Sequence, residues 1–218
     1  MSTRKKYFAV GVLIMIATLI GTAILYPHLP AQVPRHWDLR GNVNGWGGRT
    51  SSAIIMPLSM IGVMALFAVL PWLSPRKFEL DAQSTGYLWI MIGLLAFLGI
   101  LHLAILAKAV GVVQFDITRV ILGLVCLFFA ALSRALPNLR RNFYVGVRTP
   151  WTLASDQVWR ATHHFAAQTF LIGGIAGLAL ALIVPVFWLP IVMLAIGGLA
   201  PVVYSLVYYK QLEHRGQV

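Results

Sequence analysis

The sequence predicts an all-α fold, a polytopic membrane bundle of six transmembrane helices. Of the 218 residues, 59% are hydrophobic and only 11% are charged, whereas about a quarter of the residues in soluble domains are charged. The second observation is that uncharged apolar runs of about 20 residues recur along the chain, and a hydrocarbon core of about 30 Å needs that length of helix. The polar residues gather in two segments, Tyr26–Arg49 and Asn138–His164. Any specific function therefore belongs to these two segments.

The six helices are expected at Tyr7–Tyr26, Ala53–Leu73, Tyr87–Ala107, Ile117–Leu136, Phe165–Val184 and Leu189–Tyr209. The first follows a basic N-terminus, but it is long for the apolar part of a signal peptide and no small-residue cleavage site follows it. We therefore expect an uncleaved first span. The fourth contains Arg119 and Arg134, and only Val120–Ser133 between them is uncharged. The charged ends of these two arginines must therefore extend to opposite interfaces.

The last two helices share one stretch without charges, between Arg160 and Lys210. This stretch is too long for a single crossing. Pro185 and Pro190 supply the break between two helices, and Trp188 between them suits a membrane interface.

The basic residues set the expected orientation. With the N-terminus inside, the inner segments hold twelve of the 17 lysines and arginines and the outer segments hold five, and such an excess marks the cytoplasmic side. We expect both termini in the cytoplasm, Tyr26–Arg49 outside and Asn138–His164 inside. Because the charges lie at the ends of apolar runs, the net charge of +11 indicates membrane topology and no direct binding of nucleic acid.

We divide the chain into two units. Residues 1–75 form an N-terminal two-span unit with the outer loop 27–50, and residues 87–218 form a four-span unit with the inner motif 138–165. The one cysteine, Cys126, lies inside an apolar run and excludes an intramolecular disulfide.

The outer segment begins with three prolines within eight residues, which end the first helix. Gly41-Asn42 and Asn44-Gly45 are turn pairs that favour a small hairpin. Trp37 and Trp46 are large apolar groups in this polar loop. Either both pack at the membrane interface, or they form a contact surface for an amphipathic or peptide ligand.

Four side chains are weak candidates for metal ligands: His28, His36, Asp38 and His102, which we expect near the outer end of the third helix. Zinc binds such side chains, but their spacing matches no metal motif. The alternative is that they are ordinary polar loop and helix-end residues, and we expect no cofactor.

In the inner segment, Gly146 allows a turn, and Thr149-Pro150 favours an extended conformation. Ser155 is a good helix N-cap, and Asp156 suits the first turn because its charge opposes the helix dipole. One face of the following helix carries Val158, Trp159, Thr162 and Ala166, and the polar side carries Arg160 and His164. This pattern predicts an amphipathic helix at the inner surface that runs into the fifth span.

The run Asn-Phe-Tyr-Val-Gly-Val-Arg-Thr-Pro-Trp-Thr-Leu-Ala-Ser over residues 142–155, with Trp159 and His163, resembles the signature of the SdpI immunity-protein family. The outer pattern Leu29-Pro30, Val33-Pro34, His36-Trp37, Gly41 and Gly45 resembles the small domain that commonly precedes it. Together the two patterns cover most of the polar sequence, in the expected order.

The resemblance implies a membrane immunity and signalling protein of a bacterial cytoplasmic membrane. Such a protein protects against a secreted, membrane-active peptide toxin and, as a receptor, recruits a small winged-helix repressor to the membrane. The outer loop would then face the toxin and the inner motif the repressor. Arg35 and Arg40 in the outer loop would repel a strongly cationic peptide.

On this basis two sets of candidate site residues follow. The partner-binding set of the inner motif is Asn142, Gly146, Arg148, Thr149, Pro150, Trp151, Thr152, Trp159 and His163. The ligand-binding set of the outer loop is Pro30, Pro34, His36, Trp37, Asp38, Gly41 and Trp46. An architectural role for the inner motif is the alternative, with Arg148 paired to Asp156 or capping helix carbonyls.

Two other function classes stay open. No His-Glu-x-x-His, Gly-x-Ser-x-Gly or phosphate-binding glycine loop occurs, so we expect no enzyme. The one enzyme alternative is a membrane hydrolase that uses His163 and His164 beside Asp156. No charged residue lies at the centre of a span, which disfavours an ion-coupled pump. Binding of a lipid or small molecule by a permease-like bundle is the remaining alternative.

Overall fold

A computed structural model describes residues 2–38 and 41–218, and within them it confirms the all-α membrane bundle. The helices are α1 (Thr3–Leu25), α2 (Arg49–Leu73), α3 (Thr85–Ala109), α4 (Ile117–Leu132), α5 (Pro150–Ala154), α6 (Asp156–Ile183) and α7 (Trp188–His214). All except α5 are long and apolar enough to cross a membrane. The strands β1 (Gln32–Trp37) and β2 (Val43–Gly48) form an antiparallel hairpin.

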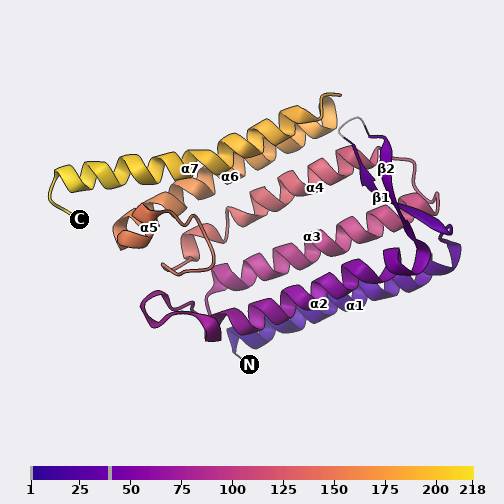
Figure 1. Ribbon diagram of the computed structural model, residues 1–218, viewed down its shortest axis with the longest axis horizontal. Coiled ribbons are helices and arrows are strands. Elements are labelled where there is room, and N and C mark those ends of the chain that lie inside the picture. Colours follow the sequence, from indigo (N-terminus) through magenta and orange to yellow (C-terminus); the bar gives the residue numbers. More distant parts are fainter. Residues whose placement is uncertain (1, 39–40) are drawn as a thin grey trace.

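The long helices lie side by side, and the hairpin and the termini lie at opposite ends of the bundle (Figure 1). We call these the hairpin end and the terminal end. The segment between α4 and α6, with the short helix α5, is at the terminal end together with both termini. The two polar segments of the sequence are therefore separated by the length of the bundle.

Three helices start four or more residues earlier than the hydropathy predicted. The first begins at Thr3, because the Ser2 hydroxyl accepts a hydrogen bond from the Lys5 N–H and caps it. The second begins at Arg49, directly after β2. The expected amphipathic helix and the fifth span are one continuous helix of 28 residues, and Ser155 caps it through the Val158 N–H as predicted. The fourth, α4, ends at Leu132, four residues before the predicted boundary, and a 3₁₀ turn over Leu136–Asn138 follows.

The largest buried cluster lies around α3. Tyr87 is buried, stacks on Phe67 with 4.7 Å between ring centroids, and donates its hydroxyl hydrogen bond to the Phe67 carbonyl over 2.9 Å. A smaller cluster of Leu29, Val33 and Leu106 fixes the hairpin to α3. Many large apolar side chains on the outside of the bundle are exposed, as a protein surrounded by lipid requires.

Small residues let α6 approach its neighbours closely. A Cβ on Gly174 would lie 2.6 Å from the Cys126 carbonyl oxygen and 2.7 Å from the Ala130 backbone nitrogen of α4. On another side of α6, a Cβ on Gly173 would lie 2.9 Å from the Met193 carbonyl oxygen of α7. Close backbone approach at small residues is how membrane helices commonly pack.

Candidate functional site

The terminal-end segment before α5 is organised around the side chain of Asn142, which is 1% exposed. Its amide nitrogen donates to the carbonyl oxygens of Arg140 and Val145, both at 2.9 Å. Its amide oxygen accepts from the N–H groups of Tyr144 and Val145, both at 2.8 Å. Every hydrogen-bonding position of this amide is used within the segment, so Asn142 holds the loop in shape.

His163 is the second internal anchor, and it is fully buried. Its Nε2 accepts a hydrogen bond from the Val147 N–H over 3.0 Å, so Nδ1 carries the proton and donates to the Trp159 carbonyl over 2.8 Å. The imidazole also stacks on the indole of Trp159, with 4.1 Å between centroids. Gly146 has φ +120°, and a Cβ there would overlap the His163 ring. Glycine is therefore needed at this turn for backbone conformation and for space.

The buried Trp159 indole N–H donates to the Leu139 carbonyl over 2.8 Å. Thr149 and Thr152 form a reciprocal cap at the start of α5. The Thr149 hydroxyl also lies 3.0 Å from the Ser205 hydroxyl of α7. The loop, α5, α6 and α7 are thus joined by buried polar contacts.

The structure divides the predicted partner-binding set into two groups. Asn142, Thr149, Thr152, Trp159 and His163 are buried. Arg148 and Pro150 are exposed, and Gly146 and Trp151 are partly exposed. The buried residues hold the loop in shape, and the exposed and partly exposed ones lie on its surface. The residues that can contact a partner in this conformation are chiefly Arg148, Pro150 and Trp151.

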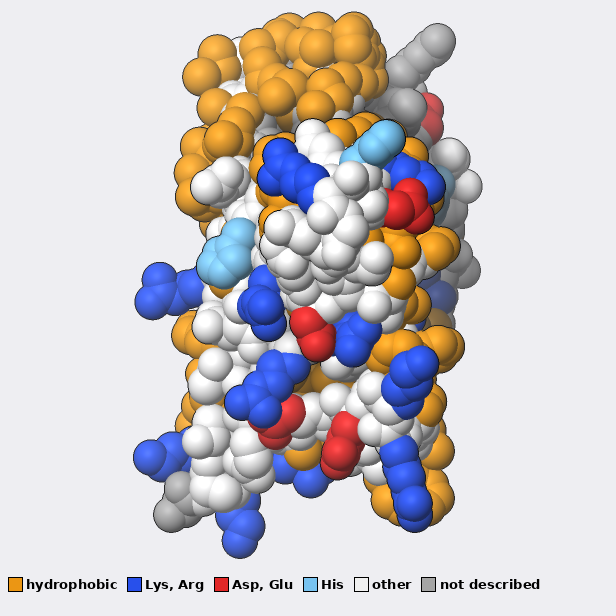
Figure 2. Space-filling model, turned by 90° about the vertical axis from the view of Figure 1, so that its left-hand side faces the viewer, with side chains coloured by type: hydrophobic (Ala, Val, Ile, Leu, Met, Phe, Trp, Pro, Cys, Tyr) orange, Lys and Arg blue, Asp and Glu red, His pale blue; other side chains and the backbone are white. Residues whose placement is uncertain are grey.

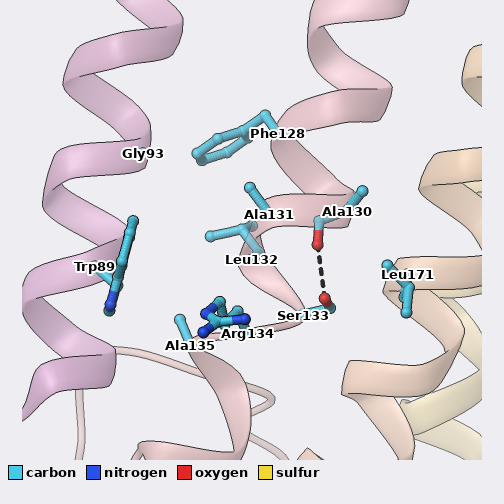
Figure 3. Close-up of a pocket in the computed structure, with 10 residues that line it drawn as sticks. All are labelled: Trp89, Gly93, Phe128, Ala130, Ala131, Leu132, Ser133, Arg134, Ala135 and Leu171. Atoms are coloured by element: carbon cyan, nitrogen blue, oxygen red, sulfur yellow. Dashed lines mark hydrogen bonds between the residues drawn. The ribbon is translucent and has the colours of Figure 1, made fainter.

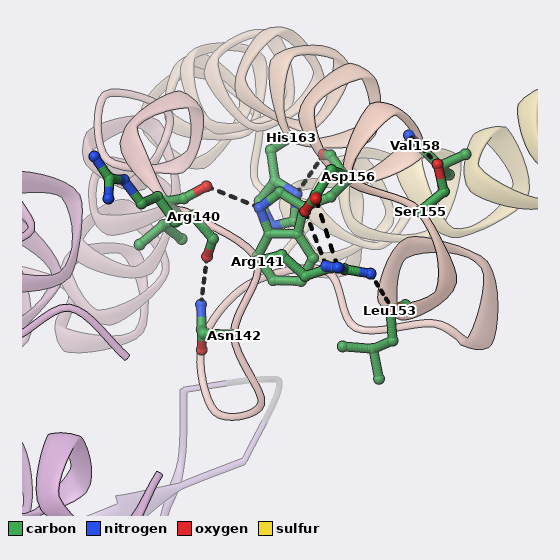
Figure 4. A network of polar contacts seen from close by, with 10 residues as sticks. Arg140, Arg141, Asn142, Leu153, Ser155, Asp156, Val158 and His163 are labelled. Atoms are coloured by element: carbon green, nitrogen blue, oxygen red, sulfur yellow. Dashed lines mark hydrogen bonds and ion pairs between the residues drawn. The ribbon is translucent and has the colours of Figure 1, made fainter. Parts of the chain in front are cut away.

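Arg148 makes neither of the two contacts that the architectural alternative gave it, a pair with Asp156 or a cap on helix carbonyls. Its Nη1 donates to the Phe143 carbonyl over 2.7 Å. Asp156 pairs instead with Arg141, at 2.9 Å, and Arg141 also donates to the Leu153 carbonyl over 2.8 Å (Figure 4). The pairing of Arg148 with Asp156 is therefore wrong: the carboxylate is taken by an arginine that the sequence does not distinguish from its neighbours.

Basic side chains dominate the terminal end. Figure 2, which looks at this end, shows many lysines and arginines among few carboxylates. A cleft of about 670 Å³ opens here and is lined by Arg76, Lys77, Arg140, Arg141 and Arg160, with Glu79 and Asp156 as its carboxylates. This end of the bundle is suited to an acidic partner surface or to anionic lipid head groups.

At the opposite end, the structure confirms the predicted hairpin, and Gly41-Asn42 lies in its loop with Gly41 at φ +83°. Asn44-Gly45 is not a turn: both residues lie in β2, and Gly45 pairs with His36 across the two strands. Trp46 is 59% exposed and Trp37 is half-buried. His36 hydrogen-bonds Asn44 over 2.5 Å, and Asp38 accepts from the Asn42 N–H over 2.9 Å. Of the other predicted ligand-binding residues, Pro30 is exposed, and Pro34 and Gly41 are partly exposed.

The weak metal candidates are not brought together. His28 and His36 are exposed, whereas His102 is buried in the bundle and its Nε2 lies 2.9 Å from the Thr22 hydroxyl. Within residues 2–38 and 41–218, no group of three or more metal-binding side chains is found.

A laterally placed cavity of about 470 Å³ lies between α3 and α4 near the terminal end (Figure 3). Trp89 and Gly93 line it from α3, Phe128 and Leu132 from α4, and the exposed Arg134 stands at its lower rim in the figure. An apolar cavity with a cation at one end suits an amphiphile with an anionic head. Hydropathy alone gave no signal for it, because it results from the packing of two helices.

Two family profiles match the chain. Residues 138–205 match the SdpI/YfhL protein family, and residues 13–61 match a domain of unknown function, DUF1648. The chain is also similar to the immunity protein SdpI of Bacillus subtilis (strain 168), with 23% identity over 212 residues that cover 94% of this chain and 96% of the relative. No solved structure gives a significant match. The first match thus contains the whole buried polar network at the terminal end, and the second contains the hairpin.

Proposed function

Because the chain belongs to the SdpI/YfhL protein family, we propose that it is a multi-pass immunity protein of a bacterial cytoplasmic membrane, which protects against a membrane-active peptide toxin and recruits a cytoplasmic repressor. The observation that carries the proposal is that Arg148 and Pro150 are exposed and Trp151 is partly exposed beside a buried polar network. A network of this kind holds a small surface in one shape, which suits recognition of a partner.

The proposed orientation follows from the same arrangement. Both termini and the basic cleft share one end of the bundle, and basic residues mark the cytoplasmic side. The hairpin, with Trp46 exposed, then faces outward, where a secreted toxin arrives. The natural chain has one cysteine, Cys126, which is buried. Cysteines introduced at Asn44 and at Gln217 therefore report accessibility cleanly: a membrane-impermeant maleimide should label the first in intact cells and the second only after lysis. The reverse labelling would overturn the orientation.

The function is tested in cells challenged with membrane-active peptides. We expect expression of this chain to raise the peptide concentration that stops growth, and a small DNA-binding protein to co-purify with the solubilised protein. Arg148→Ala should lose the co-purified partner, whereas Arg215→Ala, an exposed arginine at the same end, should retain it. No change in sensitivity to any peptide, together with no retained partner, would remove the proposal.

A second candidate function, binding of a lipid or small molecule, is favoured by the cavity between α3 and α4 with Arg134 at its rim. Native mass spectrometry should then show a phospholipid retained by the wild type and lost in Gly93→Phe, which fills the cavity. Gly62→Phe is the control, because Gly62 does not line the cavity and a Cβ there would meet no neighbour within 4 Å. Of the three residues of the hydrolase alternative, His163 has both ring nitrogens engaged in hydrogen bonds, and Asp156 pairs with Arg141. Only His164, which is exposed, keeps a side chain outside these contacts.

A further inference from the structure

A small cavity of about 220 Å³ lies under the hairpin, between β1, α2 and α3. Arg35, Ser52 and His102 supply its polar lining, and Ile55, Met56 and Ile105 its apolar lining. Ile55 is 51% exposed on the lipid-facing surface, so the cavity has an apolar wall that continues towards the bilayer. The chain thus holds a compact polar site at the hairpin end with an apolar wall on one side.

Arg35 reaches the cavity because of an irregularity in the hairpin. Pro34 pairs with Trp46 and His36 pairs with Gly45, so Arg35 is an extra residue without a partner across the ladder. Bulges of this kind redirect a side chain and occur often beside functional sites. Gly47 makes the room, since a Cβ there would overlap the Arg35 guanidinium.

Among the ion pairs of the described residues, none includes Arg35. Its Nε donates to the Ser52 hydroxyl over 2.9 Å and its Nη2 to the Ser51 hydroxyl over 2.6 Å, and both partners are neutral. The first turn of α2, beside Arg35, holds no acidic residue and has no side-chain cap. The positive end of the helix dipole therefore adds to the guanidinium charge, and together they favour an anion.

His102, which also lines the cavity, offers a hydrogen-bond acceptor where Arg35 offers a cation. The Thr22 hydroxyl donates to the Thr18 carbonyl over 2.7 Å, so it accepts from His102 Nε2–H and leaves Nδ1 of the neutral ring as an acceptor. His102 is 3% exposed. Among the described residues, the buried side-chain atoms without a hydrogen-bond partner are the hydroxyls of Thr118 and Thr162, and Nδ1 of His102 is not one of them. This acceptor remains available to a ligand in the cavity.

We propose that this cavity binds the head group of an amphiphile in which an oxyanion lies next to a hydrogen-bond donor. The oxyanion binds Arg35, the donor binds Nδ1 of His102, and the apolar part lies along Ile55 towards the bilayer. A phosphate monoester carries both groups, and so does a peptide C-terminus, with its carboxylate and amide N–H. The inference rests on the proposed role of the hairpin end in ligand recognition, and it names the chemistry that is recognised.

Four probes that share a ten-carbon chain test this in detergent solution at pH 5.5, where most of a phosphate monoester still carries one proton because its second pKa is about 6. Decyl phosphate and N-decanoylglycine carry an anion and a donor, decyl sulfate an anion alone, and decyltrimethylammonium a cation. The wild type should bind the first two more tightly than decyl sulfate and should not bind the cation. Better binding of decyl phosphate than of N-decanoylglycine assigns a lipid-type phosphate, and the reverse order assigns a peptide carboxylate.

Three variants separate the contributions. Arg35→Gln should weaken binding of all three anions by about tenfold or more, the effect of losing a hydrogen bond to a charged group. His102→Leu should remove the preference over decyl sulfate while anion binding persists. Met56→Trp should block the space and abolish binding with Arg35 still present. Arg49→Gln, a neighbouring exposed arginine outside the cavity, is the matched control and should bind like the wild type.

Equal binding by wild type and Arg35→Gln, tight binding of the cation, or equal weakening in Arg49→Gln would each overturn the proposal. Each variant is checked for a single gel-filtration peak and an unchanged unfolding temperature, and Met56→Trp decides the matter if Arg35→Gln does not fold. Binding to purified protein is independent of protection in cells. Probe binding without protection would therefore refute only the proposed function, and protection without probe binding would refute only this inference.

Discussion

The Val147 N–H donates a hydrogen bond to Nε2 of His163 over 3.0 Å, and this contact joins the terminal-end loop to the buried face of α6. The space for it is created one residue earlier, at Gly146. Most conspicuous residues of the motif at 142–163 therefore hold the loop against α6. Its few exposed side chains are the ones that a partner can reach.

Gly146→Ala should destabilise the protein strongly. The new methyl group would overlap the His163 ring, and φ +120° is strained for any residue with a Cβ. We expect a loss of about 1–3 kcal/mol in the free energy of unfolding from backbone strain alone, with the steric overlap in addition. Gly111→Ala is the control, since Gly111 has φ +78° but no neighbour within 4 Å. Thermal unfolding in detergent measures both, and equal effects would contradict a role for the contact with His163.

Trp159→Phe should cost about 1–3 kcal/mol, because it leaves the Leu139 carbonyl without its hydrogen bond inside the protein. Trp188→Phe changes the same chemistry at a position that is 57% exposed. The control should stay within about 0.5 kcal/mol of wild type. Denaturant unfolding of the two variants side by side measures the difference, and similar stabilities would show that the indole N–H is not anchored.

A double-mutant cycle should assign the partner of Asp156. Arg141→Ala and Asp156→Asn should be coupled, by up to about 1 kcal/mol, because the pair is partly exposed to solvent. Arg148→Ala and Asp156→Asn should show no coupling, since Arg148 donates to the Phe143 carbonyl instead. Coupling in the second cycle and none in the first would restore the pairing that the sequence suggested.

Gly174→Ala should disrupt the contact between α6 and α4. The added Cβ would lie less than 3 Å from two backbone atoms of α4, which cannot move as a flexible side chain can. Gly198→Ala in α7 meets nothing within 4 Å and should be neutral or stabilising by about 0.5–1 kcal/mol, because alanine favours the helix. Unfolding temperatures of the purified variants test this. An unchanged Gly174→Ala variant would mean that the two helices pack further apart.

The sequence predicts the features of this fold that depend on local pattern. Apolar length places the six membrane-spanning helices, and Ser155 with Asp156 marks the start of α6. The spacing of Val158, Trp159, Thr162 and Ala166 identifies the face of α6 that is buried. Each of these depends on residues a few positions apart, where helix geometry is sufficient.

The sequence does not predict features that depend on distant partners. Nothing in the sequence distinguishes Arg141 from Arg148 as the partner of Asp156, because the choice depends on how the loop folds back. The extra residue at Arg35 requires the register of two strands, and the contact of Thr149 with Ser205 spans 56 positions. Which motif residues bind a partner stays a prediction, and so does the division of the chain into two units.

Because α6 is continuous, a movement of its membrane-spanning part is transmitted to its first turns. At 1.5 Å per residue its 28 residues extend about 42 Å, about 12 Å more than the hydrocarbon core of a bilayer. The first turns, with Trp159 and His163, therefore belong to the same continuous helix as the glycines that pack against α4 and α7. Trp159 lies about 36 Å from Ile183 along the helix axis at 1.5 Å per residue. A tilt of about 10° about the Ile183 end would therefore displace Trp159 by about 6 Å. No internal joint absorbs such a movement, and the loop that His163 holds would travel with it.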